Sequence, residues 1–208
     1  MKISRKYPTI DESVERELLT KSWIALREPR NVWSSILFSL PFMFLNGWIT
    51  ISIVNLFSPL TFKEFGISDN GLEINFNLIY VGALWLLVVI HEILHLVFIP
   101  NFHTSKITYI GLSWFGGFVI TEEKMSKIRF LIISIAPYLL LSILFPLGLG
   151  WLGLLSAPIK ILVLLNSLAS SVDILVFFLV LFQVPKHAVI VNGGPKTYWK
   201  LLEELRNV

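Results

Sequence analysis

Four stretches of this chain are apolar for as long as a helix needs to cross the hydrocarbon core of a bilayer, roughly 20 residues. Hydrophobic residues make up 55% of the 208 residues and charged residues only 15%. A soluble domain has too little interior to bury that much apolar surface. We therefore predict an all-α polytopic membrane protein with about four transmembrane helices, at about 32–57, 76–99, 130–152 and 159–182.

The distribution of basic residues predicts how these helices are oriented. Seven of the 17 Lys and Arg precede the first span, four lie between the second and third spans, and four follow the fourth. The two remaining loops hold only Lys63 and Lys160. Because basic residues are enriched in cytoplasmic loops, both termini and the middle loop are predicted to be cytoplasmic. The positive net charge then reflects topology and contact with an anionic bilayer. We predict no nucleic-acid partner, since no basic stripe with interleaved aromatics occurs.

The chain divides into three parts on this reading: a cytoplasmic segment at 1–31, a membrane-embedded domain at 32–182, and a cytoplasmic tail at 183–208. The first segment is too long and too polar to be a cleavable signal peptide. Thr9-Ile10-Asp11-Glu12 is typical of a capping box that opens a short helix. We expect this helix to lie on the bilayer surface through one apolar side, formed by Val14, Leu18, Leu19, Trp23 and Leu26.

The second apolar stretch contains His91-Glu92-Ile93-Leu94-His95. Two histidines four apart on a helix lie about 40° apart around its axis and about 6 Å along it, so both imidazoles can reach one metal ion. The glutamate between them can polarise a water at that metal, which is the pattern of zinc hydrolases. Ionisable residues at membrane depth are costly and are candidates for function. The chain has no cysteine, so nitrogen and oxygen atoms must supply all the ligands.

A catalytic zinc site normally has three protein ligands, so a third must come from elsewhere in the chain. Apart from the motif glutamate, Asp173 is the only acidic residue in any predicted span. It shares one helical face with Asn166 and Ser170, at i, i+4 and i+7. His91 and Asp173 also lie at matching depths, roughly 12–14 Å below the cytoplasmic ends of their helices. We predict Asp173 as the third ligand. The weaker candidates are the two histidines of the cytoplasmic loops, His103 and His187.

The segment 104–123 is not typical of a transmembrane helix. It is rich in β-branched and aromatic residues with glycine breaks, which predicts a small β-hairpin or re-entrant segment between the second and third helices. Irregular backbone at membrane depth must be covered by protein or line a wet cavity. Two interpretations stay open. One is an edge strand that pairs with an extended substrate beside the metal. The other is an interfacial loop anchored by Trp114 and Phe115.

These residues resemble the site-2-protease-like intramembrane zinc metalloproteases. They are similar, more closely, to a family of small bacterial membrane proteins described as "putative zincin peptidases". The resemblance covers roughly residues 76–182. It rests on the histidine motif followed by Phe98-Ile99-Pro100, on Ala136-Pro137, and on the run from Asn166 to Asp173-Ile174. It implies a metalloprotease-like domain in a bacterial cell membrane. In that class, two histidines and a distal aspartate bind zinc, and the glutamate is the base.

The hypothesis from sequence is a zinc-dependent intramembrane peptidase. His91, His95 and Asp173 would hold Zn²⁺, and Glu92 would take a proton from the attacking water and deliver it to the leaving amine. Asn166 would bind the oxyanion or orient the carboxylate ligand of Asp173. The substrate would be a transmembrane or membrane-associated peptide, reached through a polar cleft open to the cytoplasm. Neither the oligomeric state nor the identity of the substrate follows from the sequence.

Three other interpretations remain. The histidines could be structural and hydrogen-bond to a neighbouring helix through Asp173. The chain could be a small ion or proton transporter, although it shows no internal repeat. It could also be a pseudoprotease that binds metal and acts as a scaffold. A di-iron oxygenase is disfavoured, because four histidines supply too few ligands.

Overall fold

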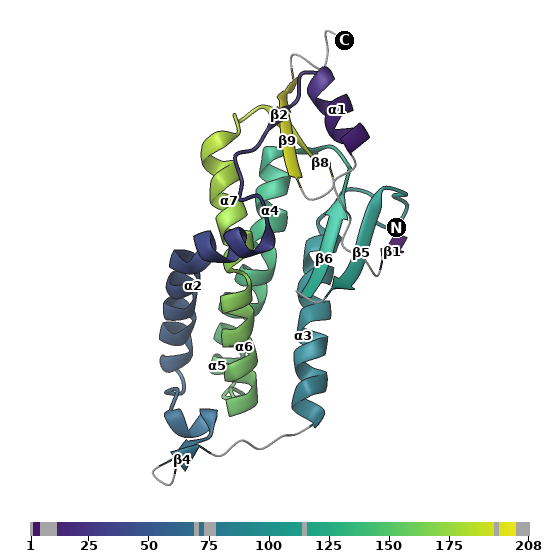
Figure 1. The fold of residues 1–208 in the computed structure, drawn as a ribbon. Coiled ribbons are helices and arrows are strands. Elements are labelled where there is room, and N and C mark those ends of the chain that lie inside the picture. The colour runs from purple at the N-terminus through teal and green to yellow at the C-terminus, as the bar shows by residue number, and fades with distance from the viewer. Residues whose placement is uncertain are drawn as a thin grey trace.

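In the computed structural model, four long apolar helices stand side by side, with small sheets gathered at one end (Figure 1). The helices are long and apolar enough to cross a membrane, at Val32–Asn55, Leu78–Val97, Lys127–Trp151 and Ala157–Gln183. These bounds confirm the four predicted spans to within a few residues. The structure describes residues 2–4, 12–68, 71–72, 78–113, 116–193 and 196–202.

The first two long helices are continuous. Helix α2 (Val32–Asn55) begins at a capping box, in which the side chains of Asn31 and Ser34 each accept from the other's backbone N–H. Pro41 lies within α2 without ending it. Helix α3 (Leu78–Val97) carries the histidine motif near its C-terminal end. Its apolar side chains are largely exposed, as expected for a surface that faces lipid.

The third and fourth long helices are interrupted. The third consists of α4 (Lys127–Pro137), the π-helical η2 (Tyr138–Leu144) and α5 (Phe145–Trp151). Pro137, at the end of α4, has no N–H to donate to the preceding turn, and the wider turns of η2 start just after it. The fourth is divided at Ser170 into α6 (Ala157–Ala169) and α7 (Ser171–Gln183).

The predicted hairpin between the second and third spans is confirmed. It consists of β5 (Thr108–Ser113) and β6 (Gly116–Thr121), which pair antiparallel from Thr108 opposite Thr121 to Ser113 opposite Gly116. The strand β1 (Lys2–Ser4) adds to the other side of β5 in parallel, so β6 remains an edge strand of this sheet. Strand β6 packs against α3 beside the histidine motif (Figure 1). Trp114 and Phe115, the expected interfacial anchors, lie outside the described residues.

The prediction of an all-α fold with one hairpin was too narrow, because segments near both ends of the chain build a second sheet together with a short strand before α4. Its strands are antiparallel, in the order β2 (Ile24–Ala25), β9 (Lys196–Leu201), β8 (Ala188–Gly193) and β7 (Met125–Ser126). The segment expected to be a tail is therefore largely structured. On the opposite end of the molecule, the loop after α2 forms the short η1 (Phe62–Phe65) and the strand pair β3 (Ile67–Ser68) and β4 (Gly71–Leu72).

The N-terminal segment packs on this second sheet. Helix α1 spans Glu12–Thr20 and ends before Trp23 and Leu26, which were expected on its apolar side. Trp23 is buried against Val191 and Tyr198, and Leu18 packs against the same cluster. The carboxylate of Glu28 accepts from the backbone N–H of Thr197 at 2.7 Å, which ties the approach to α2 to strand β9. The residues 9–11 of the expected capping box lie outside the described residues.

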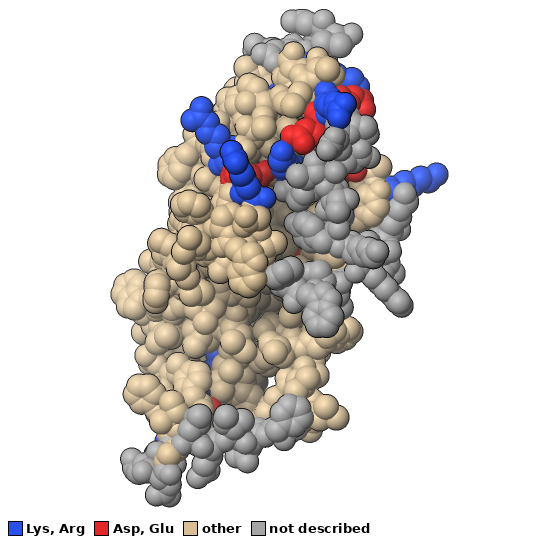
Figure 2. All heavy atoms as spheres, in the orientation of Figure 1, with Lys and Arg blue, Asp and Glu red and all other residues tan. Residues whose placement is uncertain are grey.

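Charged and apolar residues separate along the molecule. On the face shown in Figure 2, Lys and Arg gather around the end that carries α1 and the second sheet, while the surface along the long helices is almost entirely uncharged. Large apolar side chains are exposed along this surface, among them Trp33, Phe44 and Trp48 of α2. An exposed apolar belt of this extent is the surface that a bilayer covers.

Candidate metal centre

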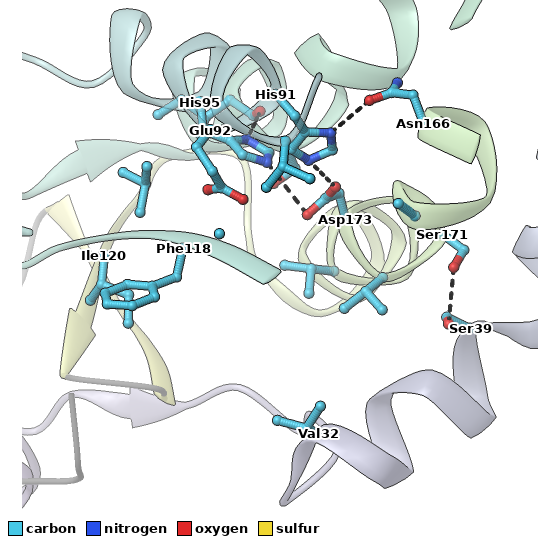
Figure 3. A pocket seen from close by; sticks show the side chains of 18 of the residues that line it. Val32, Ser39, His91, Glu92, His95, Phe118, Ile120, Asn166, Ser171 and Asp173 are labelled. Atoms are coloured by element: carbon cyan, nitrogen blue, oxygen red, sulfur yellow. Dashed lines mark hydrogen bonds and ion pairs between the residues drawn. The ribbon is translucent and has the colours of Figure 1, made fainter. Parts of the chain in front are cut away.

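Helix α3 presents three polar side chains from one turn into the interior of the bundle (Figure 3). The imidazoles of His91 and His95 lie one above the other, with ring centroids 5.0 Å apart and an interplanar angle of 72°. Only 12% and 13% of these two side chains are exposed, although most of the rest of α3 is not buried. The spacing of four residues therefore places both rings on the one face of α3 that meets other helices.

Asp173 comes from the first turn of α7 and points at both imidazoles. Its Oδ2 lies 3.2 Å from Nε2 of His91, and its Oδ1 lies 3.6 Å from Nε2 of His95. Because the fourth long helix is broken at Ser170, Asp173 lies in the first turn of α7, where the helix dipole favours a negative charge. Asp173 thus meets His91 and His95 in the structure, although at least 78 residues separate it from either histidine in the sequence.

The three side chains fit a zinc ion. Their ligand atoms, two imidazole nitrogens and one carboxylate oxygen, all lie within 4.8 Å of one another. Donors of a tetrahedral zinc at about 2.0–2.1 Å stand about 3.3 Å apart, close to the separations of Asp173 from both histidines. Nitrogen and oxygen donors suit zinc, and a set of three is the number that catalytic zinc sites use. Within the described residues, this is the group of His and acidic side chains that could hold a metal.

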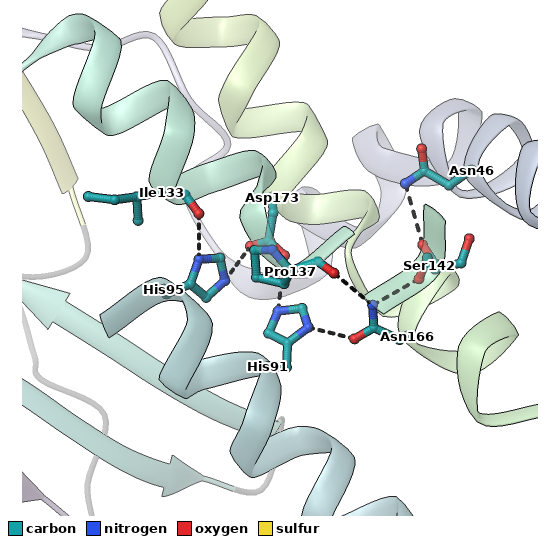
Figure 4. Close-up of polar contacts among 9 residues, drawn as sticks. Asn46, His91, His95, Ile133, Pro137, Ser142, Asn166 and Asp173 are labelled. Carbon is teal, nitrogen blue, oxygen red and sulfur yellow. Dashed lines mark hydrogen bonds and ion pairs between the residues drawn. The ribbon is translucent and has the colours of Figure 1, made fainter. Parts of the chain in front are cut away.

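Asn166 lies behind His91 and is almost fully buried. Its Oδ1 is 2.9 Å from Nδ1 of His91, and its Nδ2 donates to the carbonyl of Pro137 at 3.3 Å and to the hydroxyl of Ser142 at 2.9 Å (Figure 4). The side chain therefore orients a histidine. The sequence had left open whether it binds an oxyanion or orients the carboxylate of Asp173.

Glu92 lies beside the two imidazoles, with its carboxylate toward strand β6 (Figure 3). Its side chain is buried against the backbone at Gly117. A Cβ at position 117 would stand 2.3 Å from Cγ of Glu92 and 2.7 Å from its Oε1, so only glycine fits there without moving the glutamate. The hairpin thus forms one wall of the site, and its outer strand carries the backbone that contacts the carboxylate.

A cavity of about 750 Å³ contains these side chains. It extends between α2 and α3, over α6 and α7, and along β6. Most of its walls are apolar, including Ile36 and Met43 of α2, Leu84 of α3 and Leu165 of α6. The polar groups of the metal centre therefore lie within an apolar cavity, as is usual for a site that binds an organic ligand and fixes it with few polar groups.

The two loop histidines are not part of this group. His103 is exposed in the turn after α3, where its ring contacts Phe102. His187 is exposed between α7 and β8. Asp173 was preferred to both on its depth and helical face, and it is the residue that the structure places beside His91 and His95.

Sequence reasoning missed the residues that support the ligands from outside. Gly117 was noted only as a glycine break in the hairpin, and its contact with Glu92 depends on how β6 packs against α3. The carbonyl of Ile133, 2.9 Å from Nδ1 of His95, carried no signal of its own. Pro137 was part of the family resemblance, but no role followed from it.

One comparison with known proteins gave a match. A family model described as "Putative zincin peptidase" matches residues 84–189, just over half of the chain, and this range includes all of the ligand candidates. No match was found among the curated proteins or among the solved structures.

Proposed function

The chain belongs to the putative zincin peptidase family, and on this basis we propose that it is a zinc-dependent intramembrane peptidase of the site-2-protease-like type. It would hydrolyse peptide bonds of membrane or membrane-associated proteins. The observation that carries the proposal is the meeting of His91, His95 and Asp173, with Glu92 alongside, within a bundle of helices long enough to span a bilayer. A structural His–Asp contact alone would give no reason for the buried glutamate.

In this proposal three residues bind the metal and one acts as the general base. His91 and His95 would hold the zinc through Nε2, and Asp173 through its carboxylate. When bound, zinc supplies a Lewis acid that lowers the pKa of water and polarises the scissile carbonyl. The carboxylate of Glu92 accepts a proton from the attacking water as the oxygen of that water bonds to the carbonyl carbon. The same carboxylate then delivers that proton to the amide nitrogen as the C–N bond breaks.

The hairpin supports an extended binding mode for the substrate. Strand β6 is the outer strand of its sheet and runs along the cavity beside Glu92. A peptide that adds to this edge gains main-chain hydrogen bonds and passes the metal centre with its carbonyls in a regular register. The apolar walls formed by α2, α3 and α6 favour apolar side chains in that peptide. A membrane segment that unwinds locally meets both conditions.

We propose that the end with the second sheet faces the cytoplasm, because Lys and Arg gather there (Figure 2). A cysteine introduced as Lys186→Cys should react only with probes that enter the cytoplasm, and one introduced as Phe62→Cys only from outside. Thiol labelling of intact and permeabilised cells measures this. Labelling of position 186 from outside intact cells would contradict the orientation.

Removal of zinc tests the proposed chemistry directly. We expect the purified protein, in liposomes with a panel of fluorescence-quenched apolar peptides, to release cleavage products that a chelator abolishes and added Zn²⁺ restores. The control is Mg²⁺ in place of Zn²⁺, which suits oxygen ligands and should not restore cleavage. Cleavage that continues at full rate in excess chelator would contradict the zinc mechanism.

Gly117→Ala should reduce cleavage by about 100-fold or more, because the new methyl group displaces Glu92 from its position against β6. Zinc content, measured on the same preparation, should stay at the wild-type level, since the three ligands are untouched. The matched control is Gly82→Ala on helix α3, where an added Cβ meets nothing within 4 Å. Equal losses in the two variants would mean that the effect does not act through Glu92.

A further inference from the structure

The carbonyl oxygen of Ile133 is available to His95 because the residue four positions later is a proline. In an α-helix, a carbonyl accepts from the N–H four residues ahead, and four residues after Ile133 stands Pro137, which has no N–H. The Ile133 carbonyl instead lies 2.9 Å from Nδ1 of His95 (Figure 4). A carbonyl can only accept, so Nδ1 of His95 must carry the hydrogen.

The same proline also acts on His91, through its own carbonyl. Nδ2 of Asn166 donates to the Pro137 carbonyl at 3.3 Å, and this fixes which end of the Asn166 amide is the nitrogen. Ser142 agrees with this assignment, because its hydroxyl donates to the Val163 carbonyl and so accepts from Asn166. The oxygen of the amide must then face His91, and Nδ1 of His91 donates to it at 2.9 Å.

Both histidines are thereby held in one tautomer. With the hydrogen on Nδ1, the lone pair of Nε2 is free, and Nε2 is the nitrogen that faces Asp173 in each ring. A hydrogen bond on the far nitrogen of a metal-binding imidazole sets the tautomer, fixes the ring and raises the basicity of the ligand. Both contacts involve residue 137: the one for His95 depends on the missing N–H of the proline, and the one for His91 uses the main-chain carbonyl of that residue.

We infer that Pro137 is a positioning residue for the metal centre: its missing N–H leaves the Ile133 carbonyl to His95, and its carbonyl fixes the Asn166 amide that holds His91. The inference rests on the proposed zinc site. It gives the break between α4 and η2 a role, because a continuous helix here would return the Ile133 carbonyl to the backbone.

The variant Pro137→Ala separates this role from a purely structural one. The restored N–H competes with His95 for the Ile133 carbonyl, so the zinc affinity should fall by about 10- to 100-fold. Thermal stability of the zinc-free protein should be unchanged or higher, because a helical hydrogen bond is gained. The matched control is Pro41→Ala in α2, which restores an N–H in a helix that supplies no ligand and should leave the zinc affinity unchanged.

Two measurements make the result decisive. Wild-type zinc affinity in Pro137→Ala would overturn the inference, whereas a wild type that binds no zinc would instead overturn the proposed site. Should Pro137→Ala fail to fold, ¹⁵N NMR of the imidazoles in the zinc-loaded wild type still tests the inference. We expect protonated Nδ1 and metal-bound Nε2 in both His91 and His95. Ligation through Nδ1 in either ring would overturn it.

Discussion

Replacing both His91 and His95 with alanine is expected to reduce the zinc that copurifies with the protein from about one ion per chain to background. Only Asp173 of the three ligands would remain, and one carboxylate does not retain zinc through purification. Metal analysis of the detergent-solubilised protein measures the loss. This variant has the largest effect expected on the metal because it removes two of the three donors that the structure brings within 4.8 Å.

The controls for this experiment are His103→Ala and His187→Ala, which remove the exposed loop histidines. Each should keep about one zinc per chain. Asp173→Ala should lose the metal as well, since it removes the donor that faces both rings. Full zinc occupancy in the double histidine variant would rule out the assigned site. Normal zinc binding and cleavage in Asp173→Ala would place the third ligand elsewhere.

The four long apolar helices could be predicted because they depend on local properties. A bilayer requires a minimum apolar length, and the four spans follow from where that length is reached. The interruptions did not follow. Ser170 is an unremarkable residue in an apolar run, and the sequence alone does not show that α6 ends there. The π-helical turns after Pro137 depend in the same way on packing against neighbouring helices.

The second sheet was missed for a different reason. Residues 188–193 and 196–201 carry the β-branched and aromatic residues that are typical of strands, yet their position after the last span led us to expect a tail. The two strands pair with each other as a local hairpin, but their other partners, β2 and β7, are far away in the sequence. The pairing of β2 with β9 crosses 175 residues, from Ile24 to Trp199, and leaves no local signal. Trp23 and Leu26 were therefore assigned to a bilayer surface instead of to the protein interior.

In the metal centre, the residues with rare chemistry could be predicted and those that act through shape could not. Asp173 was found because an acidic residue is scarce in an apolar span, and its depth matched that of His91. Gly117 supports Glu92 by the absence of a side chain, and Ile133 supports His95 through a main-chain oxygen. Neither contribution depends on the chemistry of a side chain, so neither stands out in a sequence.

The second large effect is expected for Glu92→Gln. Glutamine keeps the size and the hydrogen-bonding capacity of the side chain against Gly117, but it cannot accept the proton of the attacking water. Cleavage of the liposome-embedded peptides should fall by about 10²- to 10⁴-fold, the range that a positioned general base contributes. Zinc content should stay at about one ion per chain, because Glu92 is not among the three ligands.

This combination of lost cleavage and retained zinc distinguishes the peptidase from its two rivals. A transporter would show metal or proton flux into proteoliposomes and no cleavage products from the wild type. A scaffold would keep its cellular effect with Glu92→Gln in place, because its metal and fold are intact. Glu17→Gln, which removes an exposed carboxylate of α1 outside the cavity, is a control for the charge change and should cleave normally. Wild-type cleavage by Glu92→Gln would show that the general base is another residue, and the proposed mechanism would fail at that step.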